Sequence, residues 1–279
     1  MKKDTQDQAP TVPLSLDEVG LTDFKTQISI TRGTKLYRYI TTINVVINLP
    51  SSKKGVHMSR FVESISEVLS GEIHTHYSLE QMSIHVLSKL NELHDFENAS
   101  LTLNFTFFTN RTTPISQRLS VENYNAILTT WWHQGQIIHE LTLGTYGNTA
   151  CPHALSQNPE GHTHTQRVYA ELSLKGKTEE IPDMEEISKI IDRSFSSPTF
   201  SLLKAEDEQW LIDRMWKNPL FVEDVTRNLL EFALNQFKER DLEIRAKSVS
   251  QESIHKHNIM SSGRIVLRND HMHEMRNQG

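Results

Sequence analysis

Apolar residues recur along this chain with two different spacings, and the order of these spacings limits the folds that it can adopt. From Tyr37 to Pro50, the segment YRYITTINVVINLP alternates with a period of two, which is typical of a strand with one buried face. From Met58 the period becomes helical. A second helix is predicted from SLEQMSIHVLSKLNEL, with Ser78 as its N-cap and Gln81 completing a capping box. Strand-like segments follow at SLTLNFTFFTN and near GQIIHELTLG.

The second half of the chain repeats this order. The segment QRVYAELSL alternates like a strand, MEEISKIIDRSF has helical spacing, a long helix is predicted from about Val222 to Phe237, and DLEIRAKSV returns to alternation. The repeat is one of architecture, because no motif recurs word for word. Two such β-β-α-α-β-β units would form sheets covered on one face by helices, which predicts an α+β fold. The uncovered face would need a partner subunit, so we expect an oligomer.

Composition and length set the wider limits. We expect a polar N-terminal tail over residues 1–20, a first unit over residues 21–148 and a second unit over residues 149–279. The net charge of -6 and the pI near 6.2 argue against a nucleic-acid binder, which would carry a basic face. The sequence has no run of roughly 20 apolar residues, as a membrane helix requires. We therefore expect a cytoplasmic protein.

The single cysteine of the chain, Cys151, lies close to His153, His162 and His164. One cysteine excludes an intramolecular disulfide, so this thiol is a packed small residue, a metal ligand or a nucleophile. A thiolate and the His164 imidazole suit a borderline-soft ion such as zinc, or iron(II), and a catalytic site would need a third ligand. The alternative, a packed cysteine among polar loop histidines, stays open at this point.

A second candidate, QESIHKHN, follows the last predicted strand. Glu252 precedes His255 by three residues, and His257 is two residues further on, so an extended backbone puts both imidazoles on the same side. A carboxylate beside two titratable rings suits acid/base chemistry and hydrogen bonding. The alternative is an exposed polar segment near the C-terminus.

Two charged segments are weaker candidates. In KKGVHMSRF, basic residues that include His57 and Arg60 gather at a predicted helix N-terminus, where backbone N–H groups also favour anions such as phosphate. The alternative there is a solvated basic turn. In SSPTFSLLKAEDEQW and just beyond, charged residues fall between helical segments, and charges of this kind usually face solvent. They are Lys204, Asp207, Glu208 and Asp213.

These segments, in this order, resemble the GTP cyclohydrolase family of type IB, including its archaeal iron-dependent relatives. The resemblance runs from about Phe24 to His257 and is carried by GVHMSRF, ACP followed by HTQR, SSPTFSLLKAEDE, NPLFVEDVTRNL and ESIHKH. It implies the tunnelling fold, with two tandem β-β-α-α-β-β units per subunit, and a homotetramer with active sites between subunits.

The resemblance also implies a reaction, in which GTP and water give formate and 7,8-dihydroneopterin triphosphate. This hydrolysis of cyclic amidine C–N bonds is the first step of tetrahydrofolate and pterin biosynthesis. By the same resemblance, Cys151 and His164 are ligands of a divalent metal. The resemblance leaves the third ligand open, and Asp213 or Glu208 is our candidate for it. A site of thiolate, imidazole and carboxylate accepts zinc, manganese or iron(II). A metal-activated water would attack C8 of the purine.

Roles for the remaining candidates also come from the resemblance. Glu252 would accept hydrogen bonds from the guanine edge. His255 would transfer protons during ring opening, with His257 and His153 near the substrate. The other substrate-binding residues that the resemblance implies are His57, Arg60, Arg167 and Lys204.

Two positions depart from the bacterial pattern. Where that pattern has a second cysteine, two residues after the first, this chain has His153, and Pro198 stands in place of a glutamate among its metal-site candidates. The segment SSPTF resembles the archaeal branch instead. Two other outcomes are therefore kept, an archaeal-type product, 7,8-dihydroneopterin 2',3'-cyclic phosphate, and a non-catalytic paralogue that binds a purine or pterin.

Overall fold

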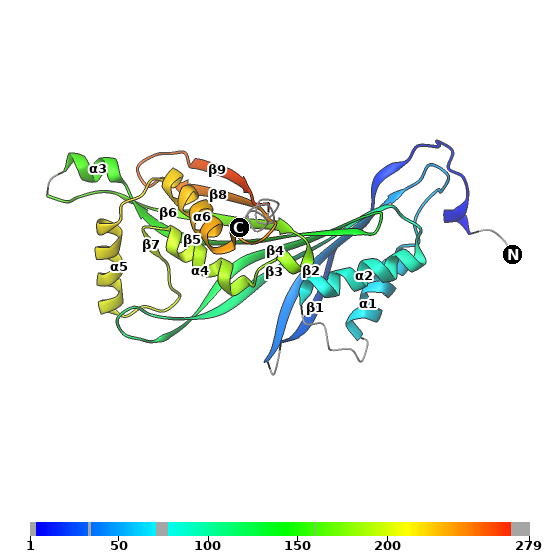
Figure 1. The fold of residues 1–279 in the computed structure, drawn as a ribbon, viewed down its shortest axis with the longest axis horizontal. Coiled ribbons are helices and arrows are strands. Elements are labelled where there is room, and N and C mark those ends of the chain that lie inside the picture. Colours follow the sequence, from blue (N-terminus) through cyan, green and yellow to red (C-terminus); the bar gives the residue numbers. More distant parts are fainter. Residues whose placement is uncertain (1–3, 33–34, 71–77, 159, 269–279) are drawn as a thin grey trace, which may run out of the picture. The chain divides into compact units, whose positions relative to one another are not determined.

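The computed structural model describes residues 4–32, 35–70, 78–158 and 160–268. In this part of the chain, nine strands form one antiparallel sheet in the order β1-β2-β3-β4-β5-β6-β8-β9, and the short β7 pairs with β5 (Figure 1). The strands are β1 (Leu16–Arg32), β2 (Lys35–Leu49), β3 (Asn98–Thr112), β4 (Leu119–His133), β5 (Gln136–Ala150), β6 (Thr165–Gly176), β7 (Ser197–Pro198), β8 (Glu243–Gln251) and β9 (Ile259–Val266).

Helices connect some of these strands. The α-helices of the described residues are α1 (Met58–Ser70), α2 (Leu79–Leu93), α3 (Pro152–Gln157), α4 (Met184–Ser194), α5 (Ala205–Lys217) and α6 (Val222–Phe237). The predicted capping of α2 is confirmed, because the Ser78 hydroxyl accepts a hydrogen bond from the backbone N–H of Gln81 at 3.2 Å. The predicted helix over residues 222–237 is confirmed as well. None of the helices described here is both long and apolar enough to span a membrane.

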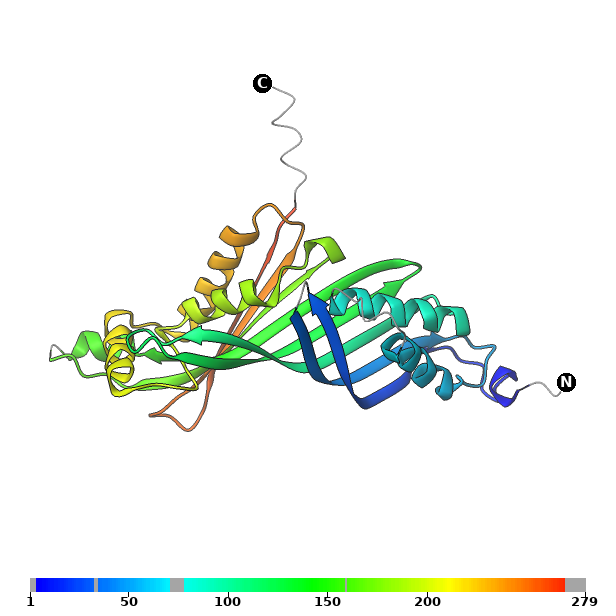
Figure 2. The same ribbon diagram turned by 90° about the horizontal axis from the view of Figure 1, so that it is seen from below.

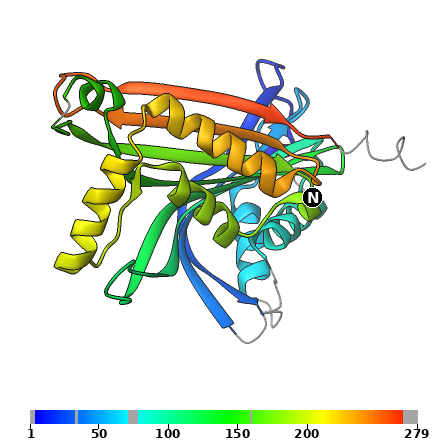
Figure 3. The ribbon, with the colours of Figure 1, turned by 60° about the vertical axis from the view of Figure 1, so that its left-hand side comes forward.

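The chain divides into two compact units, each with its own core. Unit 1 comprises residues 1–106, 127–140 and 177–179, and unit 2 comprises residues 107–126, 141–176 and 180–279. In unit 1, α1 and α2 lie side by side against the sheet and bury apolar side chains such as Phe61 and Leu87 (Figure 2). In unit 2, α6 packs against α4, β8 and β9, and its Leu229 is fully buried (Figure 3).

The prediction of an α+β tunnelling fold, made of two tandem β-β-α-α-β-β units, is wrong. The strands belong to one large antiparallel sheet with few helices, and β3, β4 and β5 each pass through both compact units. Each of these three strands is 15 residues long, so a single strand contributes to both units. Apolar periodicity identifies the strand segments, but it does not reveal where the hydrogen-bonded ladder between them continues.

The N-terminal segment belongs to the fold more closely than its polar composition suggests. The strand β1 begins at Leu16, inside the stretch that we expect to be a tail. Before it, the carbonyl oxygen of Gln6 accepts hydrogen bonds from the backbone N–H groups of Lys54 (3.0 Å) and Gly55 (3.2 Å). These bonds lay the segment before β1 onto the turn that precedes α1.

Candidate active site

Three neighbouring strands of unit 2 end together, and several predicted site residues lie at this end. β5 ends at Ala150, β6 begins at Thr165 and β8 ends at Gln251, which is paired with Arg167 of β6. Helix α3 follows β5 directly and the β8–β9 connection follows β8, so both lie at this end of the strands (Figures 1 and 3). The sheet topology therefore brings together segments that are about 100 residues apart in sequence, as expected for a strand-end site.

Cys151 and His164 are held next to each other by the backbone. The N–H of Cys151 donates to the carbonyl oxygen of His164 at 3.1 Å, and the Thr163 hydroxyl donates to the carbonyl oxygen of Cys151 at 2.8 Å. The sulfur of Cys151 accepts a hydrogen bond from the backbone N–H of Ala154 at 3.4 Å, which caps α3. The loop between the two residues turns at Gly161, whose φ of +85° is a conformation that favours glycine.

The donor chemistry of this pair fits a divalent metal. The Nδ1 atom of His164 is buried and has no hydrogen-bond partner in the described structure, which is costly for an imidazole unless something else binds it. The Cys151 thiol is half-buried and is a free cysteine. A thiolate and an imidazole nitrogen are both ligands of zinc and iron. Among the described residues, no group of three His, Cys, Asp or Glu side chains could hold a metal ion, so no third ligand lies beside Cys151 and His164 there.

The candidates for the third ligand lie on α5 and face solvent. Asp213 and Glu208 are both exposed, and the Asp213 carboxylate accepts a hydrogen bond from the Gln209 amide at 2.9 Å. Their role as ligands stays a prediction.

Asp207, the acidic neighbour of Glu208, is the buried carboxylate of this segment. It accepts hydrogen bonds from the backbone N–H groups of Ile115, Ser116 and Lys204 and from the Ser116 hydroxyl, all within 3.0 Å. Burial acts to raise the pKa of Asp207, but these hydrogen bonds outweigh it and hold the pKa well below its usual range. Asp207 therefore fastens the start of α5 to the β3–β4 turn.

The segment after β8 carries the second predicted cluster. The Ser250 hydroxyl donates to the Glu252 carboxylate at 2.6 Å. The rings of His255 and His257 are stacked, with centroids 5.2 Å apart and planes at 17°, so both imidazoles lie on the same side of the segment as predicted. Both rings are exposed, while Glu252 is half-buried. Titratable rings of this kind can exchange protons with a bound molecule.

Three further candidates of unit 2 lie around the same segments. The Arg167 guanidinium stacks over the Tyr146 ring at 4.4 Å from its centroid. His153 is exposed on α3, and Lys204 is exposed immediately before α5. The Arg167 side chain thus packs on an aromatic ring, and the other two side chains lie in solvent.

His57 and Arg60 belong to unit 1 and are engaged there. The His57 imidazole lies between two carboxylates, with Nδ1 3.7 Å from an Asp4 oxygen and Nε2 3.7 Å from an Asp7 oxygen. Arg60 donates from Nη1 to the carbonyl oxygen of Leu93 at 2.9 Å. Arg60 thus stabilises the end of α2, whereas the buried Nε2 of His57 has no hydrogen-bond partner among the described residues.

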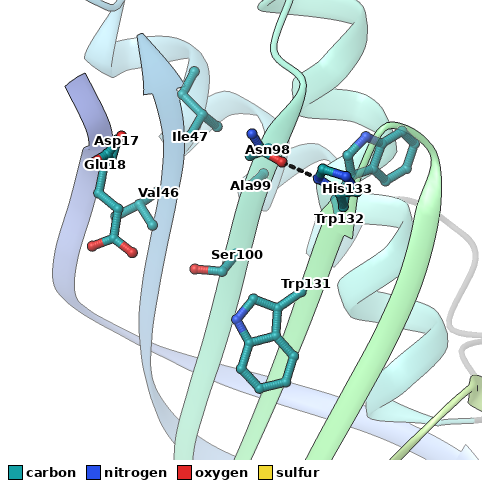
Figure 4. Close-up of a pocket in the computed structure, with 10 residues that line it drawn as sticks. All are labelled: Asp17, Glu18, Val46, Ile47, Asn98, Ala99, Ser100, Trp131, Trp132 and His133. Atoms are coloured by element: carbon teal, nitrogen blue, oxygen red, sulfur yellow. Dashed lines mark hydrogen bonds between the residues drawn. The ribbon is translucent and has the colours of Figure 1, made fainter. Parts of the chain in front are cut away.

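Unit 1 also has a hollow on the strands β1 to β4, drawn in Figure 4. Its volume is about 270 Å³, and Asp17, Glu18 and Trp131 are among the residues that line it. The close-up shows the hydrogen bond between Asn98 and His133, 2.5 Å long, at one side of the hollow. None of the predicted site residues lines it.

Sequence reasoning missed two polar residues near the strand ends. Thr149 of β5 is fully buried, Gln166 of β6 is 8% exposed, and each has a buried oxygen without a hydrogen-bond partner in the described structure. A signal for Gln166 was present, because it occupies an inward position of the alternation that continues through Val168 and Ala170.

Comparison with known proteins agrees with the motifs. Residues 2–261 match the family described as type I GTP cyclohydrolase folE2. Proteins named GTP cyclohydrolase MptA are 37% identical in Pyrococcus abyssi and 38% identical in Pyrococcus furiosus, in each case over 94% of this chain and 98% of the relative. The protein of that name from Methanococcus aeolicus is 30% identical over 99% of this chain and 98% of its own length.

Similar solved structures support the correction of the fold. Uricase from Arthrobacter globiformis has a TM-score of 0.57 at 8% identity, covering 93% of this chain and 97% of the uricase chain. At so low an identity this similarity concerns the fold alone. The sequence motifs and the match over most of the chain decide the family. The chain belongs to the type I GTP cyclohydrolase folE2 family, as its motifs predicted.

Proposed function

We propose that this protein is a metal-dependent GTP cyclohydrolase, which hydrolyses GTP to 7,8-dihydroneopterin triphosphate and formate. The observation that carries the proposal is the juxtaposition of Cys151 and His164 at the strand end that also bears Glu252. The buried Nδ1 of His164 has no hydrogen-bond partner in the part of the chain that the structure describes. In a chain of this family, that end would supply ligands for a metal ion and a carboxylate that binds the guanine base. The reaction would serve pterin or folate-type biosynthesis.

Cys151 and His164 would hold zinc, manganese or iron(II), with Asp213 or Glu208 as a third ligand. When bound, the ion supplies Lewis acidity that makes water a competent nucleophile near neutral pH. The backbone hydrogen bond between Cys151 and His164 holds the two residues side by side, so little backbone entropy would be lost on binding.

The chain's other groups would orient the base and move protons. Glu252, half-buried and already hydrogen-bonded by Ser250, would accept from the N1–H and the 2-amino group of guanine. His255 would transfer protons during ring opening, and His257 and His153 would assist it. Their exposure leaves the imidazoles free to exchange protons with solvent.

A homotetramer with active sites between subunits is part of the proposal. Large apolar side chains are exposed on strands, with Ile40 of β2 83% and Phe108 of β3 58% exposed, and such surface favours burial against another subunit. His57, Arg60, Arg167 and Lys204 would bind the triphosphate, which requires His57 and Arg60 to exchange some of their present contacts for the substrate. A cytoplasmic location stays a prediction.

A second product, 7,8-dihydroneopterin 2',3'-cyclic phosphate, is kept because the relatives from Pyrococcus are 37% and 38% identical to this chain and SSPTF resembles the archaeal branch. Mass spectrometry of the product formed from GTP, by protein reconstituted separately with each metal, distinguishes the two. A third outcome, tight binding of GTP without any new product, would support a non-catalytic paralogue and contradict the proposal.

A further inference from the structure

The N-terminal segment places two carboxylates against His57. Residues 4–8 contain the short 3-10 helix η1 (Thr5–Asp7), drawn in dark blue in Figure 2. One oxygen of Asp4 lies 3.7 Å from Nδ1 of His57, and one oxygen of Asp7 lies 3.7 Å from Nε2. The two carboxylates therefore flank a single imidazole, and we call residues 4–8 the strap.

The backbone of the strap is bonded to the turn before α1, whereas its side chains face solvent in part. The carbonyl oxygen of Gln6 accepts from the N–H groups of Lys54 and Gly55. No residue of η1 is buried, and the side chains of Asp4 and Asp7 are 61% and 41% exposed. A terminal segment held in this way can open locally while the rest of the protein stays folded.

The two carboxylates leave the His57 imidazole incompletely bonded. Its Nε2 is buried and has no hydrogen-bond partner among the described residues, although the Asp7 oxygen lies 3.7 Å away. A buried nitrogen without a partner is destabilising, so an acceptor that approaches to about 3 Å would stabilise it more than Asp7 does. A protonated imidazole donates from both nitrogens, and phosphate oxygens are strong acceptors. His57 can therefore bind a phosphate group in place of the strap.

The surroundings of His57 also favour an anion, but the strap leaves no room for one. Lys53 and Arg60 line a cavity beside His57, and Asp7 lines the same cavity. Its volume of about 10 Å³ is the space of roughly one water molecule, which is too small for a phosphate group. A phosphate group can reach His57 from this cavity only when Asp7 moves away.

We propose that the strap is an autoinhibitory segment, whose Asp4 and Asp7 carboxylates occupy the place at His57 that a phosphate group of GTP takes. Substrate and strap compete for this place, and binding of the triphosphate displaces the strap from the turn before α1. The competition concerns the phosphates, so the affinity for the base alone does not depend on the strap. This inference rests on the proposed function, which assigns the triphosphate to His57.

The test measures the binding of GTP and of guanosine, which has the same base but no phosphate. Calorimetry on the metal-free protein avoids turnover. The double variant Asp4→Asn with Asp7→Asn removes both negative charges and keeps the size of the side chains. GTP should bind about tenfold more tightly to it, because the strap loses its attraction to His57 and no longer repels the phosphates. The affinity for guanosine should stay the same.

Asp17→Asn with Glu18→Gln is the matched control. Both residues are exposed on β1 of unit 1, so this double variant makes the same change in net charge away from His57. It should leave the affinity for GTP unchanged within about twofold, since exposed charges at a distance are screened by salt.

A disulfide that fixes the strap supplies the converse measurement. A Cβ atom at Gly55 would lie 3.7 Å from Cγ of Gln6, so the double variant Gln6→Cys with Gly55→Cys can form a disulfide. The oxidised form should bind GTP at least about tenfold more weakly than the reduced form, with guanosine binding equal in both. The wild type, oxidised and reduced in the same way, controls for Cys151.

An unchanged or weaker affinity for GTP in the Asp4 and Asp7 variant would overturn the inference. So would an equal gain in the control variant or for guanosine, or equal GTP binding by the oxidised and reduced disulfide variant. Formate release by the metal-loaded wild type is measured separately, so the cyclohydrolase proposal stands or fails independently of these results. A wild type that binds neither GTP nor guanosine would overturn both.

Discussion

The backbone N–H of Cys151 donates a hydrogen bond to the carbonyl oxygen of His164 across 3.1 Å. This bond continues the β5–β6 pairing one step beyond the two strands, so the backbones of two residues at the two ends of a loop lie side by side. The sheet therefore determines where both residues lie.

This arrangement predicts that Cys151→Ala and His164→Ala each abolish stoichiometric metal binding. Each variant removes one of the proposed protein ligands, and activity should fall by at least about 100-fold, since even residues that only support a ligand are worth up to that factor. Metal content is measured by elemental analysis after reconstitution. His162→Ala is the control, because His162 is exposed in the same loop and contacts Trp216. Full metal content in Cys151→Ala would contradict the ligand assignment.

A buried histidine of unit 1 predicts that the folded protein becomes less stable in acid. His139 is fully buried, hydrogen-bonded to Thr130 (2.8 Å) and Thr178 (3.0 Å), and burial lowers its pKa from 6.5 to about 4. The unfolded state binds a proton at a higher pH than the folded state does. The contribution of His139 to the free energy of unfolding is therefore fully present above pH 6.5 and is lost as the pH falls toward 4, by about 3 kcal/mol in all.

Urea unfolding midpoints between pH 7 and pH 4 measure this effect. His139→Asn should be less stable than the wild type at pH 7, since it loses packing and one hydrogen bond, but its midpoint should fall less steeply with acid. Equal slopes in the two proteins would show that His139 does not carry the acid sensitivity.

A buried ion pair of unit 2 predicts that replacing its carboxylate by a neutral amide greatly destabilises the protein. Asp192 of α4 accepts from Arg111 Nε at 3.0 Å and from the Tyr124 hydroxyl at 2.7 Å. Burial raises the pKa of Asp192 even though both partners act to lower it. Asp192→Asn leaves Arg111 partly unpaired and should reduce the free energy of unfolding by about 3 kcal/mol.

The comparison for this variant is Glu67→Gln, which removes an exposed partner of Lys89 and should leave the unfolding midpoint unchanged within error. Chemical denaturation followed by circular dichroism gives both values. A loss as small for Asp192→Asn as for Glu67→Gln would show that this network contributes little.

A further prediction concerns the segment between β7 and α5, which leads to Lys204. The Glu122 carboxylate is buried and accepts from the backbone N–H of Ser201 at 3.0 Å and from the Ser201 hydroxyl at 3.0 Å. Glu122→Ala should speed amide exchange of Ser201 by roughly tenfold or more, because the loss of such bonds frees the segment locally. Val121→Ala, at an exposed neighbour, should leave the exchange rate unchanged; equal acceleration would contradict a role for the carboxylate.

The strands and helices with strong periodicity could be predicted from the sequence, and the way they join could not. The helix over residues 222–237 has a clear apolar stripe, and α2 has a capping residue in its sequence. By contrast, β4 was not predicted as a separate strand, and the two-residue β7 has no periodicity to detect. The continuity of one sheet through both units depends on hydrogen bonds between distant segments, which local patterns do not encode.

The part of the candidate site that could be predicted from the sequence is the part marked by a rare residue type. Cys151 and His164 stand out because the chain has one cysteine, and the structure brings their backbones into contact. Gln166 was missed because a glutamine in a strand is usually a surface residue. Its burial and its missing partner become visible only when β5, β6 and β8 are aligned.

The central claim is that the strand end with Cys151, His164 and Glu252 opens the imidazole ring of GTP. The most direct measurement is nuclear magnetic resonance of the products from GTP labelled with carbon-13 at C8, after reconstitution with zinc, manganese or iron(II). The account predicts labelled formate in a one-to-one ratio with a pterin product, and none from Cys151→Ala. Labelled GTP that remains intact with every metal, although the protein binds it, would contradict the claim.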